Sequence, residues 1–264
     1  MISALFIINN KQYTIECEES WTILDALETL RNNTSTPIHY RHSCHHGSCG
    51  TCGAIINGIE GLMCLTKINE LLQERKSLNG KGIITPKFDN GRLVVILEPL
   101  KKASIISGIA VYPHDLFQSI PEELSYKKII TRNDAIQLEA DDSYTILYEE
   151  YNRDTQYTGA PIPEESVFIE KALQRNKLEL CIECGLCLSS CPENFRGPAG
   201  LAAIHVDLHK HPTDDETYKK LLELARASDG FPGCKRHINC SRVCPQGVAP
   251  ARRIQELRII KDDE

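Results

Sequence analysis

Residues 181–192 read CIECGLCLSSCP, so four cysteines have the spacing C-x2-C-x2-C-x3-C and a proline follows the last one. This spacing is typical of bacterial two-cluster ferredoxins, in which the first three cysteines hold one iron–sulfur cluster. The fourth cysteine of such a run is a ligand of the other cluster. The run therefore predicts a second cysteine half-motif elsewhere in the chain.

The second half-motif lies at residues 234–245, which read CKRHINCSRVCP. Exchange of the fourth ligands between the two runs gives a complete [4Fe–4S] set of Cys181, Cys184, Cys187 and Cys244. It leaves three thiolates for the other centre, namely Cys191, Cys234 and Cys240. A histidine, His237, occupies the position where a [4Fe–4S] motif has its second cysteine. We therefore expect a [3Fe–4S] cluster there, and the alternative is that His237 is the ligand of a fourth iron.

A third group of cysteines lies near the N-terminus, where residues 44–52 read CHHGSCGTC. With one more cysteine downstream, this is the spacing of plant-type [2Fe–2S] ferredoxins. The predicted ligands are Cys44, Cys49, Cys52 and Cys64. Glycines at positions 47, 50 and 53 would let backbone N–H groups turn toward the sulfurs without a Cβ clash, and such hydrogen bonds tune the potential. The alternative is a zinc knuckle that includes His45 or His46, which the glycine-rich loop and the distant fourth cysteine disfavour.

These assignments use every one of the 12 cysteines except Cys17, which lies in a predicted strand and is expected to be a buried thiol. Four histidines crowd the first cysteine loop, namely His39, His42, His45 and His46. We expect them to be exposed loop residues, because four cysteines already complete a cluster. Clustered cysteines are typical of a reducing compartment. The chain starts without leader-peptide features, so a cytoplasmic location is expected.

The N-terminal part has the pattern of a small α+β domain. Expected strands span residues 4–8, 13–17, 54–56, a run that ends at 62–64, and 92–98. Between the second and third strands, Thr22 is a plausible N-cap for a helix whose apolar residues repeat from Ile23 to Leu30. The pattern becomes helical after Pro99, with expected helices at 116–124, 167–178, 201–209, 217–227 and 250–260. The polar segment from about 125 to 163 is a possible insertion. Two domains are therefore predicted, over residues 1–105 and 106–264.

The composition excludes several other classes of function. The net charge is −6 and no basic block is present, so nucleic acid is not an expected partner. The longest mostly apolar run, residues 103–112, is far shorter than the roughly 20 residues of a membrane-spanning helix. The sequence has no GxGxxG motif, P-loop or nucleophile–base pair, so no catalytic residue is predicted. The substrate chemistry is expected to belong to a partner.

In the order and spacing of its motifs, the sequence resembles the iron–sulfur subunit of the succinate dehydrogenase and fumarate reductase family, also known as the complex II family. The resemblance covers most of the chain. The segments that carry it are RHSC at 41–44, EPL at 98–100, CP at 191–192 with GPA at 197–199, NC at 239–240, and VCPQG at 243–247 followed by Pro250.

The resemblance implies a β-grasp ferredoxin domain followed by an α-helical ferredoxin domain, with a [2Fe–2S], [4Fe–4S], [3Fe–4S] relay. It also implies an FAD-containing flavoprotein partner that oxidises succinate or reduces fumarate, and membrane-anchor subunits with a quinone. Electrons would pass between flavin and quinone through the clusters in that order or in reverse, as in a respiratory chain or the tricarboxylic acid cycle. The chain would lie on the inner face of the cytoplasmic membrane, held there by its partners.

The sequence departs from the family at the quinone end. The family usually has serine and then aromatic residues including tryptophan after Cys-Pro, but residues 192–196 read PENFR and the single tryptophan is Trp21. Histidine often follows the next cluster cysteine in the family, and this chain has Lys235 there. The alternative function is the same relay in another flavin-dependent oxidoreductase with a non-quinone or unusual electron partner. A zinc-stabilised interaction module without redox function is a third hypothesis.

Overall fold

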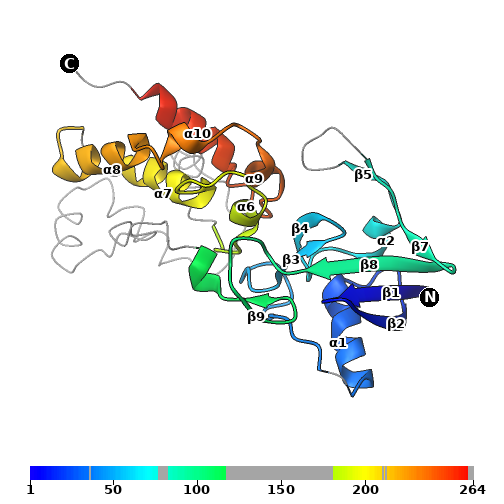
Figure 1. Cartoon of the computed structure of the whole chain (residues 1–264). Coiled ribbons are helices and arrows are strands. Elements are labelled where there is room, and N and C mark those ends of the chain that lie inside the picture. Colours follow the sequence, from blue (N-terminus) through cyan, green and yellow to red (C-terminus); the bar gives the residue numbers. More distant parts are fainter. Residues whose placement is uncertain (36, 77–82, 117–180, 210, 212, 261–264) are drawn as a thin grey trace, which may run out of the picture. The chain divides into compact units, whose positions relative to one another are not determined.

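The computed structural model describes residues 1–35, 37–76, 83–116, 181–209, 211 and 213–260. All of these residues belong to one compact unit. N-terminal residues form a mixed sheet with one long helix, and C-terminal residues form a group of helices (Figure 1).

The N-terminal sheet is built around β8. Its strands are β1 (Ile2–Ile8), β2 (Lys11–Cys17), β3 (Gly53–Ile56), β4 (Ile59–Leu62), β7 (Phe88–Asp89) and β8 (Arg92–Glu98). The order across the sheet is β2-β1-β8-β3-β4, with β7 paired to β8. β1 and β8 run parallel, and the other pairs are antiparallel. The sheet shares one core with α1 (Ile23–Asn33), and this is the expected β-grasp domain.

The first hairpin shows why its strands are longer than their apolar runs. Asn9 and Asn10 have φ values of 49° and 62°, as a two-residue type I′ turn requires. This tight turn lets β1 and β2 pair without interruption from Ile8 with Lys11 to Ile2 with Cys17. The predicted strands at 4–8 and 13–17 are therefore confirmed, and each begins two residues earlier than the sequence pattern indicated.

The long helix α1 begins where its cap was predicted. The Asp25 backbone N–H donates to Thr22 Oγ1 over 3.1 Å, and the Thr22 N–H donates to Asp25 Oδ2 over 2.9 Å. This capping box satisfies two donors that a helix start would otherwise leave unpaired. The apolar face, which includes Ile23 and Leu27, is buried in the core of the domain.

Other N-terminal predictions are confirmed with small differences. The strands predicted at 54–56 and 92–98 are β3 and β8. The run expected to end at 62–64 leaves the sheet after Leu62, so Met63 and Cys64 lie beyond β4. The sequence pattern missed several short elements, namely α2 (Ile68–Leu71), β5 (Arg75–Lys76), β6 (Ile83–Ile84), β7, β9 (Ile105–Ser107) and β10 (Ala110–Val111).

The C-terminal part has three long described helices, α7 (Pro198–Leu208), α8 (Glu216–Arg226) and α10 (Pro250–Ile259). They confirm the helices predicted at 201–209, 217–227 and 250–260. Every residue of α7 is buried, as in a helix enclosed on all sides, and α7 packs against both α8 and α10. Shorter helices stand at or near the cysteine motifs, namely α6 (Leu186–Ser189), η3 (Phe231–Gly233) and α9 (Asn239–Arg242).

Several predictions concern residues that the structure does not describe. The helix expected at 167–178 and the possible insertion at 125–163 lie outside the described residues. Of the helix expected at 116–124, only Leu116 is described, at the end of η1 (Pro113–Leu116). The domain boundary at residues 105 and 106 stays a prediction. Among the described helices, none combines the length and apolar character needed to cross a membrane.

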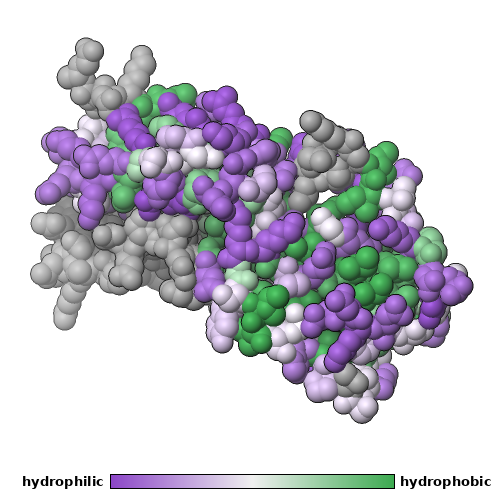
Figure 2. Space-filling model, viewed as in Figure 1, coloured by the Kyte–Doolittle hydropathy of each residue, from purple (hydrophilic) through white to green (hydrophobic). Residues whose placement is uncertain are grey.

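Apolar side chains are exposed around the β9–β10 hairpin. Ile105, Ile106 and Tyr112 are each about half exposed, at 57%, 50% and 52%. Figure 2 shows hydrophobic residues at the surface where Figure 1 places β9. In the turn of this hairpin, the Ile109 N–H donates to the His39 carbonyl over 3.0 Å. The exposed apolar side chains therefore lie beside the segment that leads into the first cysteine loop.

Candidate iron–sulfur sites

The first cysteine loop, residues 44–52, lies directly before β3. The β3–β4 hairpin brings Cys64 back to Cys52, because the Met63 N–H donates to the Cys52 carbonyl over 3.1 Å. Cys52 and Cys64 are both buried, and burial, together with the neighbouring thiolates Cys64 and Cys49, raises the pKa of Cys52 to about 12. The structure thus places Cys52 beside both Cys49 and Cys64.

Cys44 lies at the more exposed end of the same loop. Its sulfur accepts a hydrogen bond from the Cys49 N–H over 3.4 Å. The Ser48 hydroxyl and the His46 N–H also stabilise the thiolate, and the pKa of Cys44 falls to about 5. Four sulfurs with backbone donors around them fit a [2Fe–2S] cluster, whose irons bind deprotonated thiolates.

The glycines of this loop have two different roles. Gly47 and Gly50 have φ values of +79° and +68°, which an L side chain rarely adopts. Gly53 has an ordinary backbone, but a Cβ there would lie 3.1 Å from the Cys184 carbonyl oxygen. The positive φ values agree with the predicted turning role at Gly47 and Gly50, whereas at Gly53 only the packing of the second cysteine loop disfavours a side chain.

The second cysteine loop, residues 181–191, contains α6. In addition to burial, the negative charges of the Cys181 and Cys244 thiolates raise the pKa of Cys184. The same two charges and that of Cys184 raise the pKa of Cys187. Burial, which is the largest cause, raises the pKa of all three loop thiols, that of Cys184 to about 11. The Val248 N–H donates to Cys244 Sγ over 3.4 Å. The structure therefore brings together the four cysteines assigned to the [4Fe–4S] set, although they come from two distant segments.

The third group consists of Cys191, Cys234 and Cys240. Burial raises the pKa of Cys240 to about 11, and the negative charges of the Cys191 and Cys234 thiolates contribute to this rise. Burial and the charge of Cys234 likewise raise the pKa of Cys191. All three line a cavity of about 310 Å³, together with apolar side chains such as Phe195 and Ile254. This cavity is a suitable place for a compact cluster held by three thiolates.

The cavity has a cationic lining, which the sequence pattern did not predict as a group. Its basic members are Lys235, Arg236, His237, Arg252 and Arg258. Arg258 donates to the Cys234 carbonyl over 2.9 Å and also to the Phe231 carbonyl, so it fixes the backbone at Cys234. Basic side chains around a cluster favour its reduced, more negative state. No short motif marks Arg258, because it reaches this position from α10.

His237 pairs with an acidic residue at the edge of the same cavity. Its Nε2 lies 2.7 Å from Glu193 Oε1, and its side chain is 44% exposed. This pair engages one ring nitrogen, so Nδ1 is the atom that remains for a further partner. The arrangement therefore keeps both hypotheses for the third centre open.

The first and second cysteine loops are in direct contact. A Cβ on Gly50 would lie 2.4 Å from the Ile182 carbonyl oxygen and 3.0 Å from Cys184 Cβ. Gln246, which follows Cys244 and Pro245, donates from Nε2 to the Gly47 carbonyl over 3.1 Å and so links the first loop to the C-terminal cysteine run. The second and third groups are also neighbours, since thiolate charge on Cys240 acts on Cys187. The three groups therefore follow one another in space.

A buried polar link supports this contact. The Ser189 hydroxyl donates to Glu60 Oε1 over 3.0 Å and accepts the Lys101 N–H over 2.9 Å. Glu60 and Ser189 are almost fully buried, at 5% and 2% exposure. Neither residue was predicted from the sequence, because nothing in the local pattern of β4 or α6 indicates the link.

The residues expected to lie outside the clusters have different surroundings. Cys17 is fully buried in β2, and burial raises its pKa to about 11, which confirms a buried thiol. His39, His45 and His46 are exposed as predicted. The prediction is wrong for His42, which is half-buried because its ring lies against those of Tyr40 and His45. One arrangement of these histidines was not predicted. His42 and His45 contact each other, with Glu28 of α1 beside them.

Comparison with known proteins agrees with this layout. The family model described as a 2Fe–2S iron–sulfur cluster binding domain matches residues 8–118, and the model described as a 4Fe–4S dicluster domain matches residues 177–248. The chain is 27% identical over 256 residues to the fumarate reductase iron–sulfur subunit of Wolinella succinogenes, covering 94% of this chain and 87% of the relative. Over almost its whole length, the chain is similar to iron–sulfur subunits of fumarate reductase and succinate dehydrogenase.

Further relatives of this family are similar along most of the chain. The mitochondrial succinate dehydrogenase [ubiquinone] iron–sulfur subunit 1 of Oryza sativa subsp. japonica is 25% identical over 258 residues, covering 94% of this chain and 74% of the relative. Among solved structures, a chain of the Mycobacterium smegmatis Sdh1 complex in the apo form matches with a TM-score of 0.61 and 21% identity. That match covers 100% of this chain and 99% of the other, and it supports the two-domain ferredoxin fold.

Proposed function

We propose that this chain is the electron-relay subunit of a succinate dehydrogenase or fumarate reductase complex. Electrons would pass between an FAD-containing flavoprotein subunit and a membrane quinone. The observation that supports this most directly is the series of three cysteine groups: Gly50 packs against Cys184, and α6, which contains Cys187, contacts α9, which contains Cys240. Because electron tunnelling decays steeply with distance, such a series divides one long transfer into short ones.

The proposed ligands are the cysteines of the three groups. Cys44, Cys49, Cys52 and Cys64 would hold a [2Fe–2S] cluster, and Cys181, Cys184, Cys187 and Cys244 a [4Fe–4S] cluster. Cys191, Cys234 and Cys240 would hold a [3Fe–4S] cluster. The clusters supply the redox chemistry when bound, and the protein supplies their placement, burial and hydrogen bonds.

The protein's own groups would act on these clusters in different ways. The N–H groups of Cys49 and Val248 point at sulfurs and would stabilise added negative charge on the cluster ligands. The carbonyl contacts of Arg258 would fix the position of Cys234. Substrate chemistry would take place in the flavoprotein. Partner subunits would hold this chain on the inner face of the cytoplasmic membrane.

A second candidate function is the same relay in another flavin-dependent oxidoreductase with a non-quinone or unusual electron partner. The contact of Glu193 with His237 at the third cavity favours it, because the family usually has other residues near its quinone. Arg196, another departure from the family, pairs with Asp229 over 3.0 Å. The two candidates share all three clusters and differ only in the partner at this end.

The test uses the complex isolated from its native membranes through a tag on this chain. We expect a copurifying flavoprotein, succinate or fumarate turnover linked to a quinone, and the electron paramagnetic resonance signal of an oxidised [3Fe–4S] cluster. A flavoprotein without succinate or fumarate turnover would refute the primary function in favour of the second candidate. An intact third cluster without the three-iron signal would refute the [3Fe–4S] assignment.

Two matched cysteine variants test the ligand assignment. The Cys240→Ser variant should lose the third cluster and keep the signals of the first two. The Cys17→Ser variant should keep all three, because Cys17 is a buried thiol of the β1–β2 hairpin. Equal loss of iron in both variants would contradict the assignment.

A further inference from the structure

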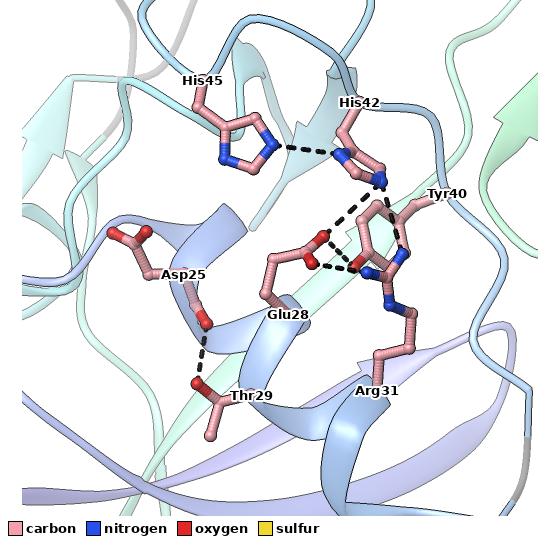
Figure 3. A network of polar contacts seen from close by, with 7 residues as sticks. All are labelled: Asp25, Glu28, Thr29, Arg31, Tyr40, His42 and His45. Carbon is pink, nitrogen blue, oxygen red and sulfur yellow. Dashed lines mark hydrogen bonds and ion pairs between the residues drawn. The ribbon is translucent and has the colours of Figure 1, made fainter.

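The polar network between α1 and the first cysteine loop has the composition of a cation site. It contains the carboxylate of Glu28 and the imidazoles of His42 and His45, and one ligand atom from each lies within 4.8 Å of the other two. His42 Nδ1 lies 3.0 Å from His45 Nε2, and His42 Nε2 lies 3.6 Å from Glu28 Oε1. Figure 3 shows the three side chains converging from the helix and the loop.

The network already attracts a positive group. The guanidinium of Arg31 donates to Glu28 Oε2 over 2.7 Å and lies 3.3 Å from His42 Nε2 (Figure 3). It therefore faces a carboxylate oxygen and a ring nitrogen, the same types of atom that bind metal ions. The Arg31 side chain is 45% exposed, so it can turn into solvent without leaving a buried charge.

The surroundings also hold the three groups in position. The Tyr40 hydroxyl donates to Glu28 Oε1 over 2.5 Å, which fixes the carboxylate while leaving it free lone pairs. A group that hydrogen-bonds to a metal ligand in this way orients the ligand and raises the affinity of the site for the metal. His45 has a φ of +61°, an uncommon backbone for a residue other than glycine. With this backbone conformation, the His45 ring lies against the His42 ring.

We propose that Glu28, His42 and His45 form a binding site for a borderline divalent cation such as Zn²⁺ or Fe²⁺, which displaces the Arg31 guanidinium. Two imidazoles and one carboxylate suit these ions, whereas Mg²⁺ and Ca²⁺ prefer oxygen ligands. His45 is exposed, so the ion reaches the site from solvent and water completes its coordination. Its ligand atoms are nitrogens and a carboxylate oxygen, not cluster sulfurs, so the proposal does not depend on the proposed relay.

The test measures Zn²⁺ binding to the holoprotein by equilibrium dialysis, with zinc and iron determined in the same samples. The wild-type protein should bind one Zn²⁺ at low micromolar free zinc without losing iron. His45→Gln should weaken binding by roughly tenfold or more, because it removes a ligand. Arg31→Gln should strengthen binding, because it removes the competing cation.

The matched control is His46→Gln in the same loop. Both ring nitrogens of His46 are engaged, with the Cys44 carbonyl and the Ser48 hydroxyl, so zinc affinity should not change. X-ray absorption at the zinc edge should show nitrogen and oxygen ligands. Sulfur ligands, equal affinity in the wild type and His45→Gln, or an equal loss in His46→Gln would overturn the proposal.

Discussion

Replacement of Gly50 by alanine tests the contact between the first and second cysteine loops. The added Cβ would lie 2.4 Å from the Ile182 carbonyl oxygen, where ordinary contact begins at 3.4 Å. The obstacle is backbone, which cannot turn aside as a flexible side-chain end does. The two loops must therefore separate by about an ångström, or the first loop must deform.

Two costs add up in this variant. The φ of +68° makes alanine unfavourable by roughly 1–2 kcal/mol, and overpacking of the contact adds roughly 1–3 kcal/mol. For a chain of this size, the sum lowers the midpoint of thermal unfolding by on the order of 10 °C. Electron transfer from the first to the second centre should also slow, because the added separation reduces tunnelling.

Gly58→Ala is the control for the backbone cost. Gly58 has a φ of +82°, and among the described residues no atom beyond its chain neighbours lies within 4 Å of the place that a Cβ would take, so only the roughly 1–2 kcal/mol backbone cost applies. Calorimetry gives the two midpoints, and electron paramagnetic resonance of the reduced holoprotein gives the magnetic coupling between the first two clusters. Equal midpoints and equal coupling in the two variants would refute the role of Gly50 as the contact between the loops.

Three further predictions follow from buried or capping groups. Ser189→Ala leaves Glu60 without its buried donor and should lower the free energy of unfolding by about 1–3 kcal/mol in denaturant titration. Thr22→Ala removes the α1 cap and should cost about 1 kcal/mol in the same assay. Burial and the charge of His209 lower the pKa of His205 to about 4. Between pH 6.5 and about 4, His205 therefore binds a proton in the unfolded chain but not in the folded protein. Stability should fall as the pH drops through this range, and His205→Asn should flatten this dependence.

The sequence was most informative where chemistry depends on spacing along the chain. The grouping of Cys181, Cys184 and Cys187 with Cys244 followed from the two cysteine runs, because an exchanged fourth ligand is typical of such motifs. The cap at Thr22 followed from an equally local signal. In both places, the residues that act together are either neighbours in sequence or belong to a known spaced motif.

Elements that depend on distant contacts could not be predicted in this way. β9 and β10 have three and two residues, which is too short for a periodic pattern. The meeting of Glu28 with His42 and His45 depends on how the loop returns to α1. The tight packing at Gly53 similarly depends on the second cysteine loop. These features arise from tertiary packing, and no local pattern encodes them.

Because β8 lies between β1 and β3, the N-terminal domain expressed by itself must include β8 to complete its sheet. The cysteine loop leaves the ribosome well before Arg92, the first residue of the strand that both β1 and β3 need as a neighbour. Until then, each of these strands has an open edge that can pair with another chain. A fragment that ends after Cys64 would therefore contain every proposed [2Fe–2S] ligand and still aggregate, whereas one that continues through Glu98 can close the sheet.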